Sequence, residues 1–99
     1  MSKRHHRARY GKGADDERAI MKMLLKMSYH TAVRSAGSRG PIDVIGIGSE
    51  QIILISATRI GQDEVSRRDK LRALRCPPNV VKELWVRRPY HGWDREVVE

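Results

Sequence analysis

Hydrophobic positions repeat with helical spacing in one segment near the start of the chain. Within residues 15–29, apolar side chains recur every three or four positions from Ile20 to Met27, so they would form one stripe along a helix. Asp15 or Asp16 at the beginning of the segment suits a helix cap, and Glu17 falls in the first turn, where the helix dipole favours negative charge. The pattern predicts a helix over residues 15–29 with a methionine-rich face in the core.

Two apolar runs in the middle of the chain predict adjacent strands. The runs "IDVIGIG" at residues 42–48 and "QIILISATR" at residues 51–59 are rich in β-branched side chains, and residues 48–50 between them suit a hairpin turn. The second run is apolar nearly throughout, as expected of a central strand that is covered on both faces. A short strand over residues 31–34 is expected to precede them.

The last third of the chain predicts a helix followed by two strands. The segment "SRRDKLRALR" at residues 66–75 begins with Ser66 as a candidate N-cap, and a Pro-Pro pair ends it. Residues 80–88 alternate enough for a strand. Residues 89–93 predict a turn, and residues 94–99 would return antiparallel to that strand.

Taken in order, these elements predict an α/β fold. A helix, a three-strand meander, a second helix and two closing strands favour a mixed, mostly antiparallel sheet with flanking helices. A chain of 99 residues suits a single compact domain, which we place at residues 13–99.

The chain is strongly basic, with 20 Lys and Arg residues against 12 Asp and Glu residues and a net charge of +8. Such a balance on a small domain favours a polyanionic partner such as DNA. Residues 1–12 contain no acid and predict a flexible basic arm that contacts phosphate, with a plain solvated tail as the alternative. The cations of this arm are Lys3, Arg4, Arg7, Arg9 and Lys12.

Two further features bear on location and partners. No apolar run reaches the ~18 residues of a membrane span, which argues against a membrane partner. Cys76 is the only cysteine, so an intramolecular disulfide is impossible, and a reducing cytoplasm is the expected compartment.

Three segments carry a resemblance to a known family. They are "GKGADDER" at residues 11–18, "VRSAGSRGPIDVI" at residues 33–45 and "IILISATR" at residues 52–59. They resemble the opening of the first helix, the Arg-Ser-x-Gly-Ser loop with its acidic strand, and the motif strand of archaeal-type Holliday junction resolvases. This family belongs to the PD-(D/E)xK nuclease superfamily. The resemblance therefore implies a restriction-endonuclease-like core, a homodimer and a four-way DNA junction as the partner.

The resemblance also implies roles for individual residues. In that family two acids, often with a third on the first helix, hold Mg²⁺, which activates water and neutralises charge on the scissile phosphate. By position, Glu17 stands for the helix acid and Asp43 for the first strand acid. Ser56 and Thr58 stand where the resemblance expects the second acid and the lysine that stabilises the transition state.

Hydroxyl side chains at both motif positions predict the loss of cleavage. A hydroxyl carries no charge, binds Mg²⁺ weakly and cannot replace an ammonium group. Loss of one positioned proton-transfer group typically lowers a rate by ~10²–10⁴, and here a metal carboxylate is missing as well. We therefore expect Glu17 and Asp43 to be vestigial, with no bound metal. Asp63 and Glu64 are the only credible substitute acids.

Binding of DNA is expected to survive the loss of cleavage. The resemblance implies a ring of arginines around the former catalytic cleft. The loop that contains Ser35 and Ser38 would bring backbone amides close to phosphate. The expected DNA-binding arginines are Arg18, Arg34, Arg39 and Arg59 around the cleft and Arg4, Arg7 and Arg9 in the arm.

Two alternatives stay open. One is an active, Mg²⁺-dependent, structure-specific endonuclease with relocated acids, in which Asp43 and Glu17 would hold the metal. The other is a non-catalytic partner subunit or an RNA-associated protein. No aromatic side chain lies in residues 38–59, so that segment has no stacking platform of the kind that single-strand RNA readers use.

Overall fold

The described residues form two helices and five strands. In this computed structural model the backbone is described for residues 2–35 and 40–99, and the side chains are described from Ala14 onward within those ranges. In chain order the elements are α1 (Ser2–Lys26), β1 (Thr31–Arg34), β2 (Val44–Ile47), β3 (Ile52–Arg59), α2 (Glu64–Ala73), β4 (Val80–Arg88) and β5 (Gly92–Val97).

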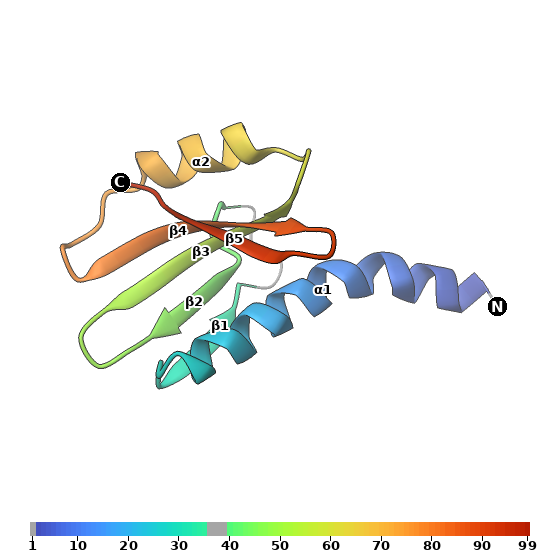
Figure 1. Ribbon diagram of the computed structural model, residues 1–99, viewed down its shortest axis with the longest axis horizontal. Coiled ribbons are helices and arrows are strands. Elements are labelled where there is room, and N and C mark those ends of the chain that lie inside the picture. The colour runs from blue at the N-terminus through green and yellow to red at the C-terminus, as the bar shows by residue number, and fades with distance from the viewer. Residues whose placement is uncertain (1, 36–39) are drawn as a thin grey trace.

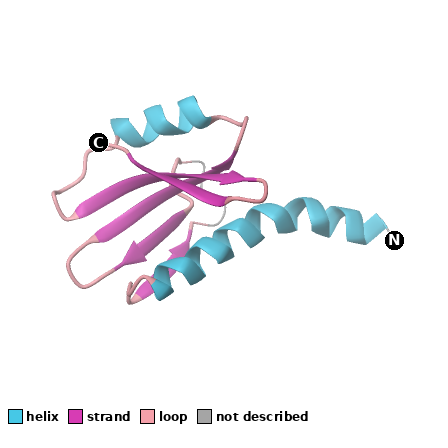
Figure 2. Ribbon diagram, in the orientation of Figure 1, coloured by secondary structure: helices cyan, strands magenta, loops and turns pink. Residues whose placement is uncertain are grey.

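The five strands make one mixed sheet in the order β1-β2-β3-β4-β5. Three neighbouring pairs are antiparallel, whereas β3 and β4 are parallel and are connected through α2. Figure 1 shows α1 and α2 on opposite faces of the sheet, and Figure 2 shows the same arrangement by secondary structure. The predicted α/β class with a mixed, mostly antiparallel sheet and flanking helices is confirmed.

Each helix closes a separate hydrophobic core against its own face of the sheet. Gly46 allows α1 to approach closely, because a Cβ there would lie 2.7 Å from Ile53 Cγ2 and 2.9 Å from Leu24 Cδ1. The core under α1 consists of Ile20, Leu24, Val44, Ile53, Ile55 and Trp85. The core under α2 consists of Leu71, Leu84, Val86 and Val98.

The predicted start and end of the first helix were wrong. α1 runs from Ser2 to Lys26 rather than over residues 15–29. Arg, Lys and Ala, which are strong helix formers, dominate the added segment, and this favours the longer helix despite its glycines. At the other end, Ser28 adopts a left-handed φ of 75°, which stops the helix. The flexibility expected for residues 1–12 stays a prediction.

Two later boundaries also differ from the prediction. α2 begins at Glu64, so Ser66 is not its N-cap; Asp63 holds that position, with a φ of 36° and no side-chain hydrogen bond to the helix. β5 begins at Gly92, inside the turn expected over residues 89–93, because pairing with β4 extends to Arg88. Within the described part of the chain, neither helix is long and apolar enough to cross a membrane.

Candidate functional site

A polar cleft of about 440 Å³ lies at the end of β3, where segments from both faces of the sheet meet. The cleft is lined by the carboxyl end of β3, by α1, by the residue before β2, and by the start of α2 with the loop that leads to it. The lining residues are Asp16, Glu17, Asp43, Ala57, Thr58, Arg59, Gln62 and Arg67. The fold therefore brings together acids and arginines that are far apart in the sequence.

Asp43 is fixed in the cleft by both its backbone and its side chain. Its N–H donates to Ile55 O at 2.8 Å, and its carbonyl accepts from Ser35 N at 2.9 Å. Its Oδ2 accepts from the Ala57 N–H at 2.8 Å and from Arg67 Nη1 at 3.0 Å. The carboxylate is thus held between β3 and the first turn of α2.

Burial raises the pKa of the Asp43 carboxyl above its ordinary value. The Ala57 N–H and the Arg67 charge act in the opposite direction, and the negative charge of Glu17 adds to the increase. Hydrogen bonds from Ala57 and Arg67 therefore stabilise the ionised form of Asp43, whereas burial and the charge of Glu17 disfavour it.

Arg67 connects Asp43, which directly precedes β2, with β3. Its Nη1 donates to Asp43 Oδ2 and also to Ser56 Oγ at 3.1 Å. Ser56 is fully buried, and the hydroxyl of Thr58, also buried, donates to Gln62 O at 3.1 Å. A guanidinium group consequently lies between the strand acid and the residue at the expected position of the second acid.

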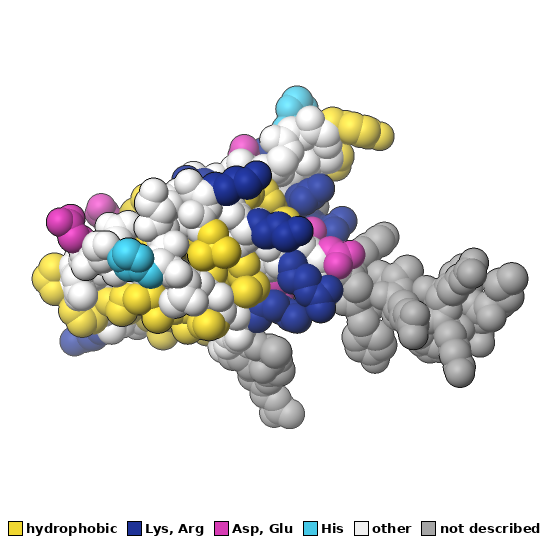
Figure 3. Space-filling view, turned by 90° about the horizontal axis from the view of Figure 1, so that it is seen from below, with side chains coloured by type: hydrophobic (Ala, Val, Ile, Leu, Met, Phe, Trp, Pro, Cys, Tyr) yellow, Lys and Arg dark blue, Asp and Glu magenta, His cyan; other side chains and the backbone are white. Residues whose placement is uncertain are grey.

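The other acids of the cleft are also paired with arginines. Glu17 Oε1 accepts from Arg34 Nε at 2.8 Å. Asp16 forms ion pairs with Arg59 at 3.0 Å and with Arg87 of β4 at 3.8 Å. The face seen in Figure 3 has Lys and Arg side chains grouped near its middle with Asp and Glu side chains among them, whereas hydrophobic side chains gather at one end.

Several of the residues predicted from sequence do come together. Glu17, Asp43, Thr58 and Arg59 line the cleft, and Arg34 joins it through Glu17. Ser56, at the other motif position, is reached through Arg67.

Other predicted residues lie elsewhere or outside the described residues. Arg18 does not line the cleft; it forms an exposed ion pair with Asp15 at 3.6 Å. Ser35 contributes its backbone N–H to Asp43 rather than to an open loop surface. Ser38 and Arg39 fall outside the described residues, as do the side chains of Arg4, Arg7 and Arg9.

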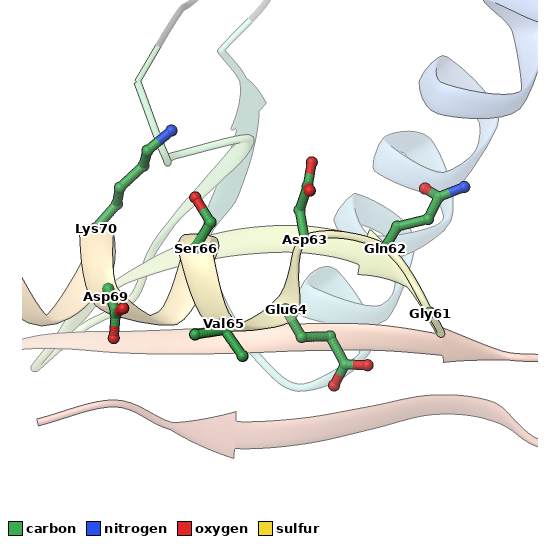
Figure 4. Close-up of a pocket in the computed structure, with 8 residues that line it drawn as sticks. All are labelled: Gly61, Gln62, Asp63, Glu64, Val65, Ser66, Asp69 and Lys70. Atoms are coloured by element: carbon green, nitrogen blue, oxygen red, sulfur yellow. The ribbon is translucent and has the colours of Figure 1, made fainter.

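The proposed substitute acids do not reach the cleft. Asp63 and Glu64 line a different, open pocket of about 760 Å³ at the start of α2. Figure 4 shows the Asp63, Ser66 and Lys70 side chains on one side of the helix and the Glu64, Val65 and Asp69 side chains on the other. The two acids therefore diverge from each other and cannot replace the missing motif acid as a pair.

Sequence reasoning missed Asp16, Gln62, Arg67 and Arg87. One signal was available for Arg67, because a helix that directly follows a strand places its first turn near the carboxyl end of that strand. Asp16 precedes Glu17 and was considered only as a cap. Arg87 required the register of β4, in which it pairs with Arg59.

The cleft does not fit the divalent ion that an active nuclease of the resembled kind requires. Among the residues with described side chains, no three His, Cys, Asp or Glu side chains gather so that they could hold a metal ion. Asp43 and Glu17 each accept a hydrogen bond from a guanidinium group, and the motif positions offer only hydroxyls. A dication placed at Asp43 would lie beside the positive charge of Arg67.

Comparison with known proteins adds no family: no protein-family model matches the chain, and neither does any curated protein sequence.

Proposed function

We propose that this protein binds duplex or branched DNA through its phosphates, with a restriction-endonuclease-like core that does not cleave. The observation that carries the proposal is the Arg67 guanidinium, hydrogen-bonded to both Asp43 and Ser56. It supplies a fixed positive charge where a nuclease of this kind would hold a metal ion. The order of a helix, a meander, a second helix and a parallel strand supports the same core.

Phosphate contacts are supported by the exposed arginines at the rim of the cleft. Arg59 and Arg87 share Asp16, which holds both side chains at one place, yet they remain 42% and 43% exposed. A carboxylate that positions two guanidinium groups leaves their outer N–H groups directed to solvent, where a phosphate oxygen can accept from them. Contacts of this kind fix position on the duplex and read no bases.

The proposal extends to assembly and location. The resemblance to junction resolvases favours a homodimer that spans a two-fold junction, and the single Cys76 favours a reducing cytoplasm. Light scattering of the purified protein at several concentrations measures the mass and tests the dimer directly.

Fluorescence anisotropy tests the binding. A labelled four-way junction and a linear duplex of the same sequence are titrated over a series of NaCl concentrations. If the protein makes about six phosphate contacts, log K falls with log salt with a slope near −5. Arg59→Gln is expected to weaken binding to both DNAs and to make the slope less negative by about 1.

The matched control is Arg75→Gln, which removes one exposed charge near Pro77 and Pro78, away from the cleft. This variant is expected to bind as the wild type does. A slope near zero for the wild type, or an equal loss of affinity in Arg59→Gln and Arg75→Gln, would reject phosphate binding at the cleft.

A second candidate is an active endonuclease, because Asp16, Glu17 and Asp43 all line one cleft. This candidate predicts a nick in the four-way junction with Mg²⁺ or Mn²⁺ that Asp43→Asn abolishes. Our proposal predicts intact junction in both metals under conditions where the anisotropy shows saturation.

A further inference from the structure

The hairpin between β4 and β5 ends in a fully exposed aromatic side chain. Arg88 pairs with Gly92 across the hairpin, so Pro89, Tyr90 and His91 form its tip. All three tip residues are exposed, and the side chain of Tyr90 is fully accessible to solvent. A tyrosine ring combines a large apolar surface with a polar end, and proteins commonly use such rings for contact with other molecules.

The geometry of the turn does not require a tyrosine at this position. The His91 N–H donates to Arg88 O at 3.2 Å, and Tyr90 has a φ of 65°. A proline at the second position and a positive φ at the third are the features of a type II turn, whose third position favours Gly or Asn. Tyr90 thus holds a backbone conformation that suits glycine, and it packs against no core that would compensate.

The hairpin tip is next to the arginine rim of the cleft. Arg87 lies one residue before Arg88, pairs with Arg59 in the sheet register and forms an ion pair with Asp16. Its guanidinium lies 5.4 Å from the ring centre of Trp93, its partner on β5, and the two groups form a cation–π contact. In Figure 1 the tip lies at the same end of the sheet as the carboxyl end of β3.

We propose that Tyr90 stacks on an unpaired or unstacked base of DNA whose backbone phosphates are held by Arg59 and Arg87. The proposal rests on the proposed function and adds a substrate class, namely DNA with a branch, bulge or single-stranded end. Every base has a π face, so one exposed ring beside a phosphate-binding rim recognises an unstacked base whatever its identity. A fully paired duplex offers no such face along its length.

A double-mutant cycle across the protein and the DNA tests the stacking. The two DNA ligands are a labelled duplex with one unpaired adenine and the same duplex with an abasic site at that position. Wild-type protein is expected to bind the adenine form about tenfold more tightly, since stacking of one base on an aromatic side chain contributes on this scale. Tyr90→Phe is expected to keep this preference, whereas Tyr90→Gly and Tyr90→Ala lose it.

Two variants separate stacking from folding. Glycine adopts a φ of 65° without steric strain, whereas alanine retains the backbone strain of tyrosine. Tyr90→Gly is therefore expected to have a melting temperature equal to or above that of Tyr90→Ala. Loss of the adenine preference in both variants, with unchanged affinity for a fully paired duplex, therefore reports the ring alone.

The outcomes also separate this inference from the proposed function. If wild type binds paired duplex with the expected salt dependence but shows no adenine preference, or if Tyr90→Gly keeps that preference, the stacking role is wrong and the phosphate role stands. If wild type binds none of the DNAs, the proposed function is wrong and the stacking role falls with it.

Discussion

At the scale of single residues, the ionisation of Asp43 is opposed by its surroundings. Burial raises the pKa of its carboxyl despite the hydrogen bonds from Ala57 and Arg67, so the folded protein binds the proton more tightly than the unfolded chain does. The resulting contribution to stability is fully present below the ordinary Asp value of 3.8 and is lost as the pH rises through the raised pKa.

The direction of this contribution predicts a measurable difference in pH-dependent stability between wild type and Asp43→Asn. The free energy of unfolding of wild type, relative to that of the variant, is expected to fall as the pH rises from about 3.5 to 7. Urea denaturation at a series of pH values measures it. Asp15→Asn, at a side chain that is 73% exposed and does not line the cleft, is measured in parallel as the control. A difference that grows with pH would show that the attraction of Arg67 outweighs burial.

At the scale of elements, Lys82 connects the sheet to the end of α2. This β4 side chain is only 9% exposed, and its Nζ donates to Leu71 O at 2.8 Å and to Leu74 O at 2.7 Å. The last carbonyls of a helix lack their usual partners within the helix. Leu71 O accepts from the Leu74 N–H as well, and the charged Lys82 donor adds to this bond, satisfies Leu74 O and complements the helix dipole. Because the start of α2 carries Arg67, this connection helps to hold the cleft in place.

Lys82→Met is expected to lower the free energy of unfolding by about 1–2 kcal/mol, since two carbonyls at the end of α2 lose a charged donor while the removal of a buried charge offsets part of the loss. Chemical denaturation monitored by tryptophan fluorescence measures the change. Lys70→Met on the exposed side of α2 should have little effect. Equal stability of the two variants would mean that the Lys82 bonds contribute nothing net.

The elements differ in how far the sequence predicts them. β4 was predicted with its observed bounds, because a partly alternating segment between a proline pair and a turn leaves few alternatives. The limits of α1 were not predicted, because the apolar stripe covers only its packed part and the rest depends on helix propensity alone. The start of α2 was missed by two residues, since Asp63 caps it without a side-chain bond.

The site was only partly predicted because its arginines depend on contacts between elements. Arg67 lies four positions before the buried Leu71 and so shares its face of α2, but the strand that this face meets follows from packing. Glu17, Asp43 and the two hydroxyl positions were available from their place in the resembled motifs. The contacts of Arg67 and Asp16 depend on packing between segments that are far apart in sequence, which no local pattern encodes.

At the scale of the whole molecule, the positive charges fall into two groups: the arginines of the cleft, which are paired with acids, and the cations that lie outside the cleft. Within the cleft, Arg34, Arg59, Arg67 and Arg87 face the carboxylates of three acids. Most of the net charge of +8 must therefore come from outside the cleft, and residues 1–12 supply five cations without an acid. Long-range attraction of DNA is expected to depend on this segment more than on the cleft.

Replacing Arg4, Arg7 and Arg9 together by Gln tests this division. Gln and Arg have similar helix propensities, so the backbone preference of α1 is kept while three charges are removed. The slope of log K against log salt is expected to become less negative by about 2 to 3, with affinity lost equally for junction and duplex. Anisotropy titrations on both DNAs measure the two quantities.

A triple variant of Lys26, Arg72 and Arg75 to Gln removes the same charge from exposed positions elsewhere on the domain. If charge acts only through the overall field, both triple variants weaken binding alike; if the N-terminal segment contacts phosphates, only its own variant changes the slope. Loss of slope in the first variant alone would assign those phosphates to α1. The remaining slope would then belong to Arg59 and Arg87, whose shared partner Asp16 lies on the same helix.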